Sequence, residues 1–296
     1  MIKKIFSSSF VLILLIFSCN SDSDDSSSEV WEQKSEMLTN WTDNFIIPSY
    51  ATLTSKLEYL EESVNTFANA TNQQNLDILR IDFFNAYMSW QSVEMFDIGL
   101  AEETYYKSKM NIYPTTTSRI ELNIQNGNTD FNNSNNYSAQ GFPALDYLLY
   151  GIETSDELIL SKYNTEPQYL SYLSQLINQM LQNTYPIVED WQSYRSSFIS
   201  SVENTATSSV NKMTNDFIYY YEKGFRANKF GIPAGVFSGG ALPEKVEAFD
   251  NKIISKALAL EAFDAIEAFY EGKNLTTGVS YTCLLYTSDA ADDTPC

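Results

Sequence analysis

Residues 73–99 read QQNLDILRIDFFNAYMSWQSVEMFDIG, and this stretch decides the fold. Its large apolar residues recur every three or four positions, at Leu76, Leu79, Phe83, Tyr87, Trp90 and Val93. That spacing places them on one face of an α-helix. The stretch stops at Gly99 and is predicted to be a long amphipathic helix over about 73–98, packed against other helices.

The same spacing continues towards the N-terminus. A helix is predicted from Ser28-Glu29, with apolar residues from Trp31 to Ile46, before Pro48. A second helix is indicated by five regularly spaced apolar residues, which are Leu53, Leu57, Leu60, Val64 and Phe67. Long amphipathic helices with short connections are typical of antiparallel bundles.

Towards the C-terminus the pattern predicts short helices at about 115–125 and 143–150, separated by a polar loop at 126–137. Longer helices follow at about 166–184 and 202–224, and Pro186 either starts another helix or kinks a continuous one. A last helix is predicted to start at Pro243-Glu244. Its expected apolar stripe is Val246, Phe249, Ile253, Ala257, Leu260, Phe263, Ile266 and Phe269 or Tyr270. The chain is therefore predicted to be all-α.

Composition narrows the chemistry. The chain contains no histidine and three cysteines, and its formal net charge is −20. Lack of histidine excludes Ser-His-Asp and Cys-His catalysis and histidine-ligated metal sites. The strong negative charge disfavours nucleic acid as a partner. Cations and basic ligands are compatible with it, although solubility alone also explains surface acidity.

The N-terminus is typical of an exported protein. Lys3 and Lys4 precede an apolar run at residues 10–17 that is too short to span a bilayer, so residues 1–18 are predicted to be a signal peptide. The run ends Ile16-Phe17-Ser18-Cys19, which resembles a lipobox and predicts lipidation of Cys19. Residues 19–28 contain no apolar residue after Cys19 and are predicted to form a disordered acidic tether. The expected partner is the lipid bilayer, and the expected location is the outer membrane of a cell envelope, on its periplasmic face or at the cell surface.

The C-terminus has a different character. Residues 283–292, CLLYTSDAAD, translate TGT CTC TTA TAC ACA TCT GAC GCT GCC GAC, which resembles a transposon-derived sequencing adapter. Residues 283–296 are therefore interpreted as adapter read-through. On this interpretation, one or more native C-terminal helices are missing, and Cys19 is the only native cysteine.

The first candidate site is the segment 141–151, GFPALDYLLYG. In a helix, Pro143, Asp146, Tyr147 and Tyr150 share one face, which could line a pocket. The alternative is a short packed helix with tyrosines at its rim.

The second candidate site is the loop that contains Arg226 and Lys229. Its two cations could hold an anion or pair with Asp146, or they could simply favour a helix C-terminus.

Three segments together resemble the imelysin family, the M75 peptidase group of bacterial envelope proteins. Residues 141–151 are similar to a Gly-x-His-x-x-Glu signature, with Gly141 in place, Pro143 where the His would be and Asp146 where the Glu would be. Residues 82–90 are similar to an aromatic third helix. Residues 221–235 are similar to a loop signature that includes Lys229, Gly231, Pro233 and Gly235, followed by a helix in which Pro243, Val246 and Glu247 match.

The resemblance implies an all-helical fold of two packed bundle halves, at 29–151 and 152–282, with a site in the groove between them. It also implies a role in iron acquisition, while some members are described as peptidases. Pro-x-x-Asp in place of His-x-x-Glu departs from the pattern on which a metal site rests. Asp146 remains a possible ligand for iron or another hard cation, but no second carboxylate can be assigned.

The resulting hypothesis is a non-enzymatic binding or accessory lipoprotein that serves iron or haem-iron uptake and works with other uptake proteins. Two alternatives remain open. One is a metallopeptidase, which needs a metal-bound water and a base. The other is a scaffold that binds another envelope protein.

Overall fold

The computed structural model describes the backbone of residues 23–273 and the side chains from residue 30 onward. The predicted signal peptide, the lipidation site Cys19 and the interpreted adapter segment lie outside the described residues. Within the described chain, every regular element is a helix or a helical turn. In chain order these are α1 (Ser23–Asn40), η1 (Trp41–Ile46), α2 (Ile47–Asn69), α3 (Gln73–Gln91), α4 (Leu100–Glu103), α5 (Tyr106–Met110), α6 (Thr117–Asn126), η2 (Ser134–Ala139), α7 (Gly141–Asp146), η3 (Tyr147–Gly151), α8 (Asp156–Thr165), α9 (Pro167–Ser200), α10 (Ser209–Tyr219), η4 (Tyr220–Gly231), η5 (Pro243–Lys245) and α11 (Ser255–Glu271).

The all-α prediction is confirmed, and the stretch 73–99 supplies the central helix α3. This helix ends at Gln91, before the predicted end at about 98, and turns follow it. Asn72 caps α3, because its side chain accepts a hydrogen bond from the backbone N–H of Asn75. The predicted apolar face of α3 is buried. The helix packs against both α2 and α11, so it joins the lower and upper parts of the molecule.

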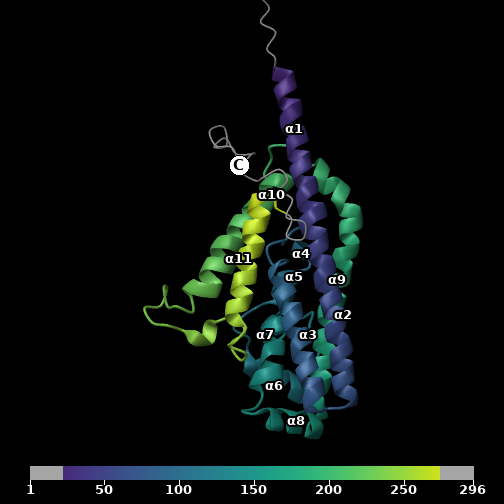
Figure 1. The fold of residues 1–296 in the computed structure, drawn as a ribbon, viewed down its shortest axis with the longest axis vertical. Coiled ribbons are helices and arrows are strands. Elements are labelled where there is room, and N and C mark those ends of the chain that lie inside the picture. Colours follow the sequence, from purple (N-terminus) through teal and green to yellow (C-terminus); the bar gives the residue numbers. More distant parts are fainter. Residues whose placement is uncertain (1–22, 274–296) are drawn as a thin grey trace, which may run out of the picture.

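Two long columns run through the fold (Figure 1). Helix α1, the π-helical turn η1 and α2 follow one another without a break, and α9 packs along α2 and α1. Helices α6, α7 and α8 lie at the lower end in Figure 1, whereas α10 lies towards the upper end and α11 runs down from it through the middle of the fold. Helix α9 contacts α1 and α2 and also α6, α7 and α8, so residues on both sides of the predicted boundary at 151/152 pack against each other. No helix in residues 23–273 combines the length and apolar character needed to cross a bilayer.

Several predicted boundaries differ from the structure. Helix α1 begins at Ser23, inside the segment predicted to be a tether. The helix α9 passes through Pro186, which removes one backbone donor without ending the helix. The helix predicted at 202–224 instead begins at Ser209 and continues through η4 to Gly231. Helix α9 tolerates Pro186 because the surrounding residues, among them Thr184 and Ile187, are buried in the core and hold the helix in place.

The predicted start of the last helix is wrong. Residues 243–245 form one short 3₁₀ turn, and α11 begins at Ser255. Ala248 has φ of 54°, a left-handed conformation that a right-handed helix does not contain. The predicted stripe is also rotated, since Ile253 is 90% exposed and Leu260 is 52% exposed. The buried face of α11 instead consists of Leu258, Ala262, Ala265, Ile266, Ala268 and Phe269.

Candidate functional site

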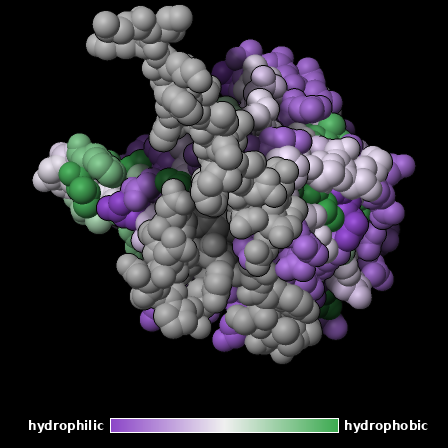
Figure 2. All heavy atoms as spheres, turned by 90° about the horizontal axis from the view of Figure 1, so that it is seen from above, coloured by the Kyte–Doolittle hydropathy of each residue, from purple (hydrophilic) through white to green (hydrophobic). Residues whose placement is uncertain are grey.

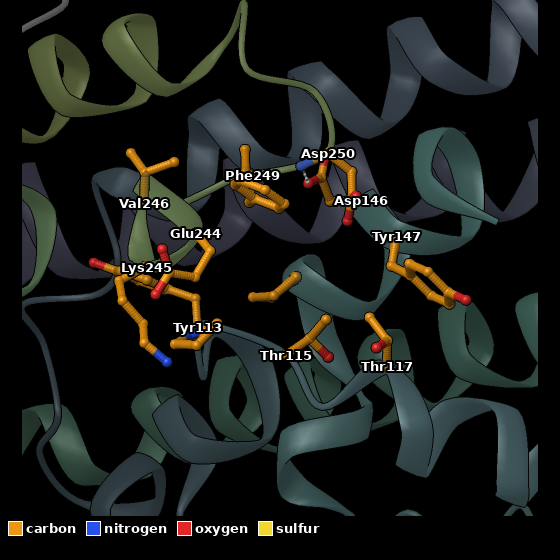
Figure 3. Close-up of a pocket in the computed structure, with 13 residues that line it drawn as sticks. Tyr113, Thr115, Thr117, Asp146, Tyr147, Glu244, Lys245, Val246, Phe249 and Asp250 are labelled. Atoms are coloured by element: carbon orange, nitrogen blue, oxygen red, sulfur yellow. Dashed lines mark hydrogen bonds between the residues drawn. The ribbon is translucent and has the colours of Figure 1, made fainter. Parts of the chain in front are cut away.

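A cavity of about 310 Å³ lies where three separate segments of the chain meet. Its walls come from the connection at 113–116 and the first residue of α6, from α7 and the start of η3, and from residues 244–250 (Figure 3). Three of the predicted site residues line it, namely Pro143, Asp146 and Tyr147. The polar face predicted for the segment 141–151 therefore does border a pocket, although Tyr150 lies elsewhere.

The signature helix α7 is held close to the end of α5 by Gly141. This glycine has φ of +76°, and a Cβ added to it would lie 2.1 Å from the carbonyl oxygen of Met110. A side chain at this position would therefore clash with backbone and force a strained conformation. Pro143 follows in the first turn of α7, where a missing backbone N–H is tolerated. It gives the cavity wall a ring without any ligating atom.

Asp146 fastens one wall of the cavity. Its side chain is buried, with the residue 1% exposed, and its carboxylate accepts hydrogen bonds from the backbone N–H groups of Asp250 at 2.8 Å and Asn251 at 3.1 Å. Burial raises the pKa of Asp146 to about 7, against the lowering effect of the hydrogen bond from Asp250. Both carboxylate oxygens are therefore committed to the 248–251 backbone, as the orientation in Figure 3 shows.

Tyr147 lines the cavity with its near edge but directs its ring away from Asp146 (Figure 3). Its hydroxyl donates to Glu121 Oε1 at 2.6 Å, and the hydroxyl of Tyr169 donates to the other oxygen of the same carboxylate. Tyr150 instead lies under the guanidinium of Arg80, which is 4.4 Å from the ring centroid. Tyr150 therefore packs at the lower end of the fold and takes no part in the cavity.

The two cations of the second candidate site are directed to different places. Arg226 is exposed and pairs with Glu222 one helical turn earlier. Lys229 is buried, with a side chain 2% exposed, and its Nζ lies 2.6 Å from Glu247 Oε2. Neither cation pairs with Asp146. The π-helical winding of η4 is what turns position 229 inward while position 226 stays at the surface.

A buried polar network surrounds Lys229. Its Nζ also donates to Gln91 Oε1 at 2.7 Å and lies 3.6 Å from Glu94 Oε2. The side chain of Asn111 donates to both Glu94 and Glu247, at 3.1 and 2.8 Å. Burial lowers the pKa of Lys229, but the attraction of Glu247 and Glu94 outweighs it, so the pKa is raised above its ordinary value. Glu247 is thus a structural partner of Lys229.

The other loop residues form a projection away from the cavity. Gly235 has φ of +79°, and a Cβ there would lie 2.0 Å from the carbonyl oxygen of Gly240. The carbonyl of Pro233 accepts from the backbone N–H of Leu242 at 2.8 Å, while Gly231 packs under the ring of Phe237. The tip of this projection carries hydrophobic residues (Figure 2), with Phe237 71% exposed. Gly231, Pro233 and Gly235 therefore shape a turn and do not reach the cavity.

Within residues 23–273 no group of three or more aspartate, glutamate, cysteine or histidine side chains is placed to hold a metal ion. Asp146 therefore does not gain the second carboxylate that a hard-cation site at that position would need. Such a site would in addition compete with two backbone N–H groups for the Asp146 oxygens.

Comparison with known proteins identifies the fold. A family model described as imelysin (Peptidase_M75) matches residues 46–285. The chain belongs to the imelysin family. Two solved structures resemble it. A putative iron-regulated protein A precursor from Parabacteroides distasonis ATCC 8503 has a TM-score of 0.70 and 14% identity, with 88% of this chain and 79% of that one covered. An imelysin-like protein from Psychrobacter arcticum 273-4 has a TM-score of 0.67 and 18% identity, with the same shares covered. Among curated protein sequences, none matches the chain.

These TM-scores show that the fold is shared. The residues at the signature of this imelysin do not fit a resident metal ion, because Pro143 offers no ligating atom and Asp146 already binds two backbone amides. The resemblance in sequence thus located the helix that lines the cavity, while its chemistry differs from the pattern.

Sequence reasoning missed most of the cavity and its surroundings. The polar run after Pro114 in residues 113–117 could have indicated residues that line a cavity. Glu121 and Tyr169 lie in ordinary helical patterns, so no local signal marks them. Glu94 follows the apolar stripe of the stretch 73–99, and no local pattern connects it with Lys229, which lies 135 positions later in the chain. Contacts at such separations are set by packing.

Proposed function

We propose that this imelysin is a lipid-anchored, non-enzymatic binding protein that serves iron or haem-iron acquisition in a bacterial cell envelope. The observation that carries the proposal is the cavity beside the signature helix α7, lined by Pro143, Asp146 and Tyr147. A fold neighbour is titled an iron-regulated protein A precursor, which is consistent with this role.

The chemistry of the cavity favours binding over peptide hydrolysis. A metallopeptidase needs an ion that activates water and a base beside it. Position 143 offers a proline ring, and the carboxylate of Asp146 is buried against the N–H groups of Asp250 and Asn251. The side chain of Pro143 has no atom that ligates an ion, and both oxygens of Asp146 already accept hydrogen bonds from backbone N–H groups. These features support a role in which the cavity holds its ligand unchanged.

The size and lining of the cavity favour a small ligand. Its volume of about 310 Å³ is at the lower end of the range of about 300–1,000 Å³ for small-molecule sites. Thr115 and Thr117 offer hydroxyl groups at one wall, and Lys245 offers an ammonium group at another. The carboxyl groups of Asp146, Glu244 and Asp250 also line the cavity, and its small volume suits a compact iron complex better than a macrocycle such as haem.

The test measures which ligands the chain from residue 20 onward binds. The probes are ferric nitrilotriacetate, haem and salts of copper, zinc and calcium, and binding is measured by calorimetry and metal analysis. Wild-type protein is expected to bind an iron form, and Thr117→Trp, which fills the cavity, is expected to weaken it at least tenfold. Ser118→Trp is the matched control, because Ser118 is exposed and does not line the cavity. No binding of any of these probes would refute the proposal.

The anchor is tested separately. We expect the full chain, expressed with its own signal in a Gram-negative host, to incorporate labelled fatty acid and to partition into detergent. Cys19→Ser is expected to abolish both, since stable anchoring requires the acyl chains. Labelling that persists in Cys19→Ser would show that the anchor lies elsewhere.

A further inference from the structure

Three oxygen-bearing side chains from three helical elements meet beside the cavity. Glu121 comes from α6, Tyr147 from η3 and Tyr169 from the start of α9. The hydroxyl of Tyr147 donates to Glu121 Oε1 at 2.6 Å, and that of Tyr169 donates to Glu121 Oε2. One carboxylate thus bridges two phenols, an arrangement that brings together four oxygen atoms.

These oxygens suit a hard, highly charged cation. The 2.6 Å between the Tyr147 hydroxyl and Glu121 Oε1 is the distance of an O–H···O hydrogen bond, so the two oxygens are close enough to share one ion once the proton has left. Carboxylate and phenolate oxygens are hard ligands and favour a small trivalent ion over soft metals. We propose that Tyr147, Tyr169 and Glu121 form a ferric ion site at the edge of the cavity. The inference rests on the proposed function and names its metal-binding residues.

The charge balance supports this assignment. When Fe³⁺ binds, each phenol releases its proton to solvent, so two phenolates and one carboxylate supply three negative charges against three positive ones. No electron is transferred, and the remaining positions around the ion are left to water or to the arms of a bound chelate.

The surroundings are negative on balance. The charged groups that act on the two tyrosines come from several elements, and they are Glu121, Glu153, Lys162, Glu166 and Asp250. Lys162 is the one cation among them, and its Nζ lies 4.8 Å from the ring centroid of Tyr169 while pairing with Glu153 at 3.0 Å. The carboxylates around the two tyrosines therefore outnumber the single cation, Lys162.

Access from solvent is open on one side. Glu121 and Tyr147 are both partly exposed, whereas Tyr169 is buried at 5% exposure behind them. An ion that approaches from solvent would meet Tyr147 and Glu121 before it reaches Tyr169. Two ligands at the surface and one behind them give a site that can fill without opening the helical core.

The experiment is titration of the chain from residue 20 onward with ferric nitrilotriacetate, followed in the visible spectrum. Wild-type protein is expected to develop a tyrosinate-to-iron charge-transfer band. Tyr147→Phe and Tyr169→Phe are each expected to reduce the band and to raise the dissociation constant at least tenfold. Glu121→Gln is expected to weaken binding similarly. Urea unfolding of each variant checks that it is folded.

Tyr185→Phe is the matched control. Its hydroxyl donates to Glu58 Oε1 at 2.9 Å, so it is also a tyrosine paired with a glutamate, but without a second tyrosine. This variant is expected to bind iron as the wild type does.

The outcomes separate this inference from the proposed function. Iron binding with a band that survives both tyrosine substitutions would overturn the ferric site and leave the proposed function standing. The same holds if the protein binds haem or another probe but develops no band with ferric iron. Failure to bind every probe would overturn both.

Discussion

Replacing Lys229 with methionine should destabilise the protein strongly. The change keeps most of the aliphatic stem but removes the ammonium group, which is 2.6 Å from Glu247, 2.7 Å from Gln91 Oε1 and 3.6 Å from Glu94. Both carboxylates are buried, with side chains 3% and 4% exposed. The variant would therefore leave two buried negative charges without their only cationic partner in the described network.

The size of the effect follows from that geometry. Removing one partner of a buried ion pair costs about 3–5 kcal/mol, because the remaining charge is uncompensated. Asn111 still donates to Glu247 at 2.8 Å and to Glu94 at 3.1 Å in the variant, which offsets part of the loss. We therefore expect a decrease of about 3 kcal/mol in the free energy of unfolding, a large part of the 5–15 kcal/mol typical of domains.

Urea unfolding followed by circular dichroism measures this loss as a shift in midpoint at constant slope. The pKa of Lys229 is raised in the folded state, so its contribution is fully present below the unfolded value of about 10.4 and is lost only at higher pH. The effect should therefore be constant between about pH 6 and about pH 9. Lys223→Met, an exposed position on the same helix, is the control and should change little.

A double variant tests the mechanism. Lys229→Met with Glu247→Gln restores the original net charge of the buried group, so it should recover part of the stability lost by Lys229→Met alone. A Lys229→Met variant that loses less than about 1 kcal/mol, or a double variant whose losses simply add, would refute the assignment of Lys229 as the cation that stabilises this network.

Two further predictions concern the signature helix. Asp146 has a pKa of about 7 in the folded state, above its ordinary value, so its contribution to stability is present at low pH and is lost as the pH rises from about 4 to about 7. The free energy of unfolding of Asp146→Asn, measured with urea relative to wild type, should therefore rise by about 2–3 kcal/mol as the pH increases from about 5 to about 8. A difference that does not change with pH would contradict this. Gly141→Ala should destabilise by more than about 2 kcal/mol, because its Cβ would meet the Met110 carbonyl at φ of +76°. Gly127→Ala, at φ of +60° with no atom within 4 Å, should lose only about 1 kcal/mol when both variants are compared by urea unfolding, and equal losses would show that the clash is relieved.

Much of the helical architecture is predictable from local spacing. The stripes of α2 and α3 follow the three- and four-residue periodicity of an α-helix, and their residues are buried as predicted. The last helix shows the limit of this reasoning. An apolar periodicity runs from Val246 through Phe269, yet residues 246–254 do not continue the helix, because Asp146 binds the 250–251 backbone and Glu247 turns inward to Lys229. Those partners lie far away in the sequence.

The candidate site likewise has features that the sequence predicts and features that only packing decides. The sequence by itself determined the helical class, the family and the position of the helix that lines the cavity, because periodicity and short motifs are local properties of the chain. Only the tertiary structure decided that Lys229 neutralises buried Glu247, that Asp146 clamps a distant loop, and that Tyr147 meets Tyr169 on Glu121. Each of these contacts joins elements far apart in the sequence, and its geometry exists only once α3, α7, α9 and η4 have packed together.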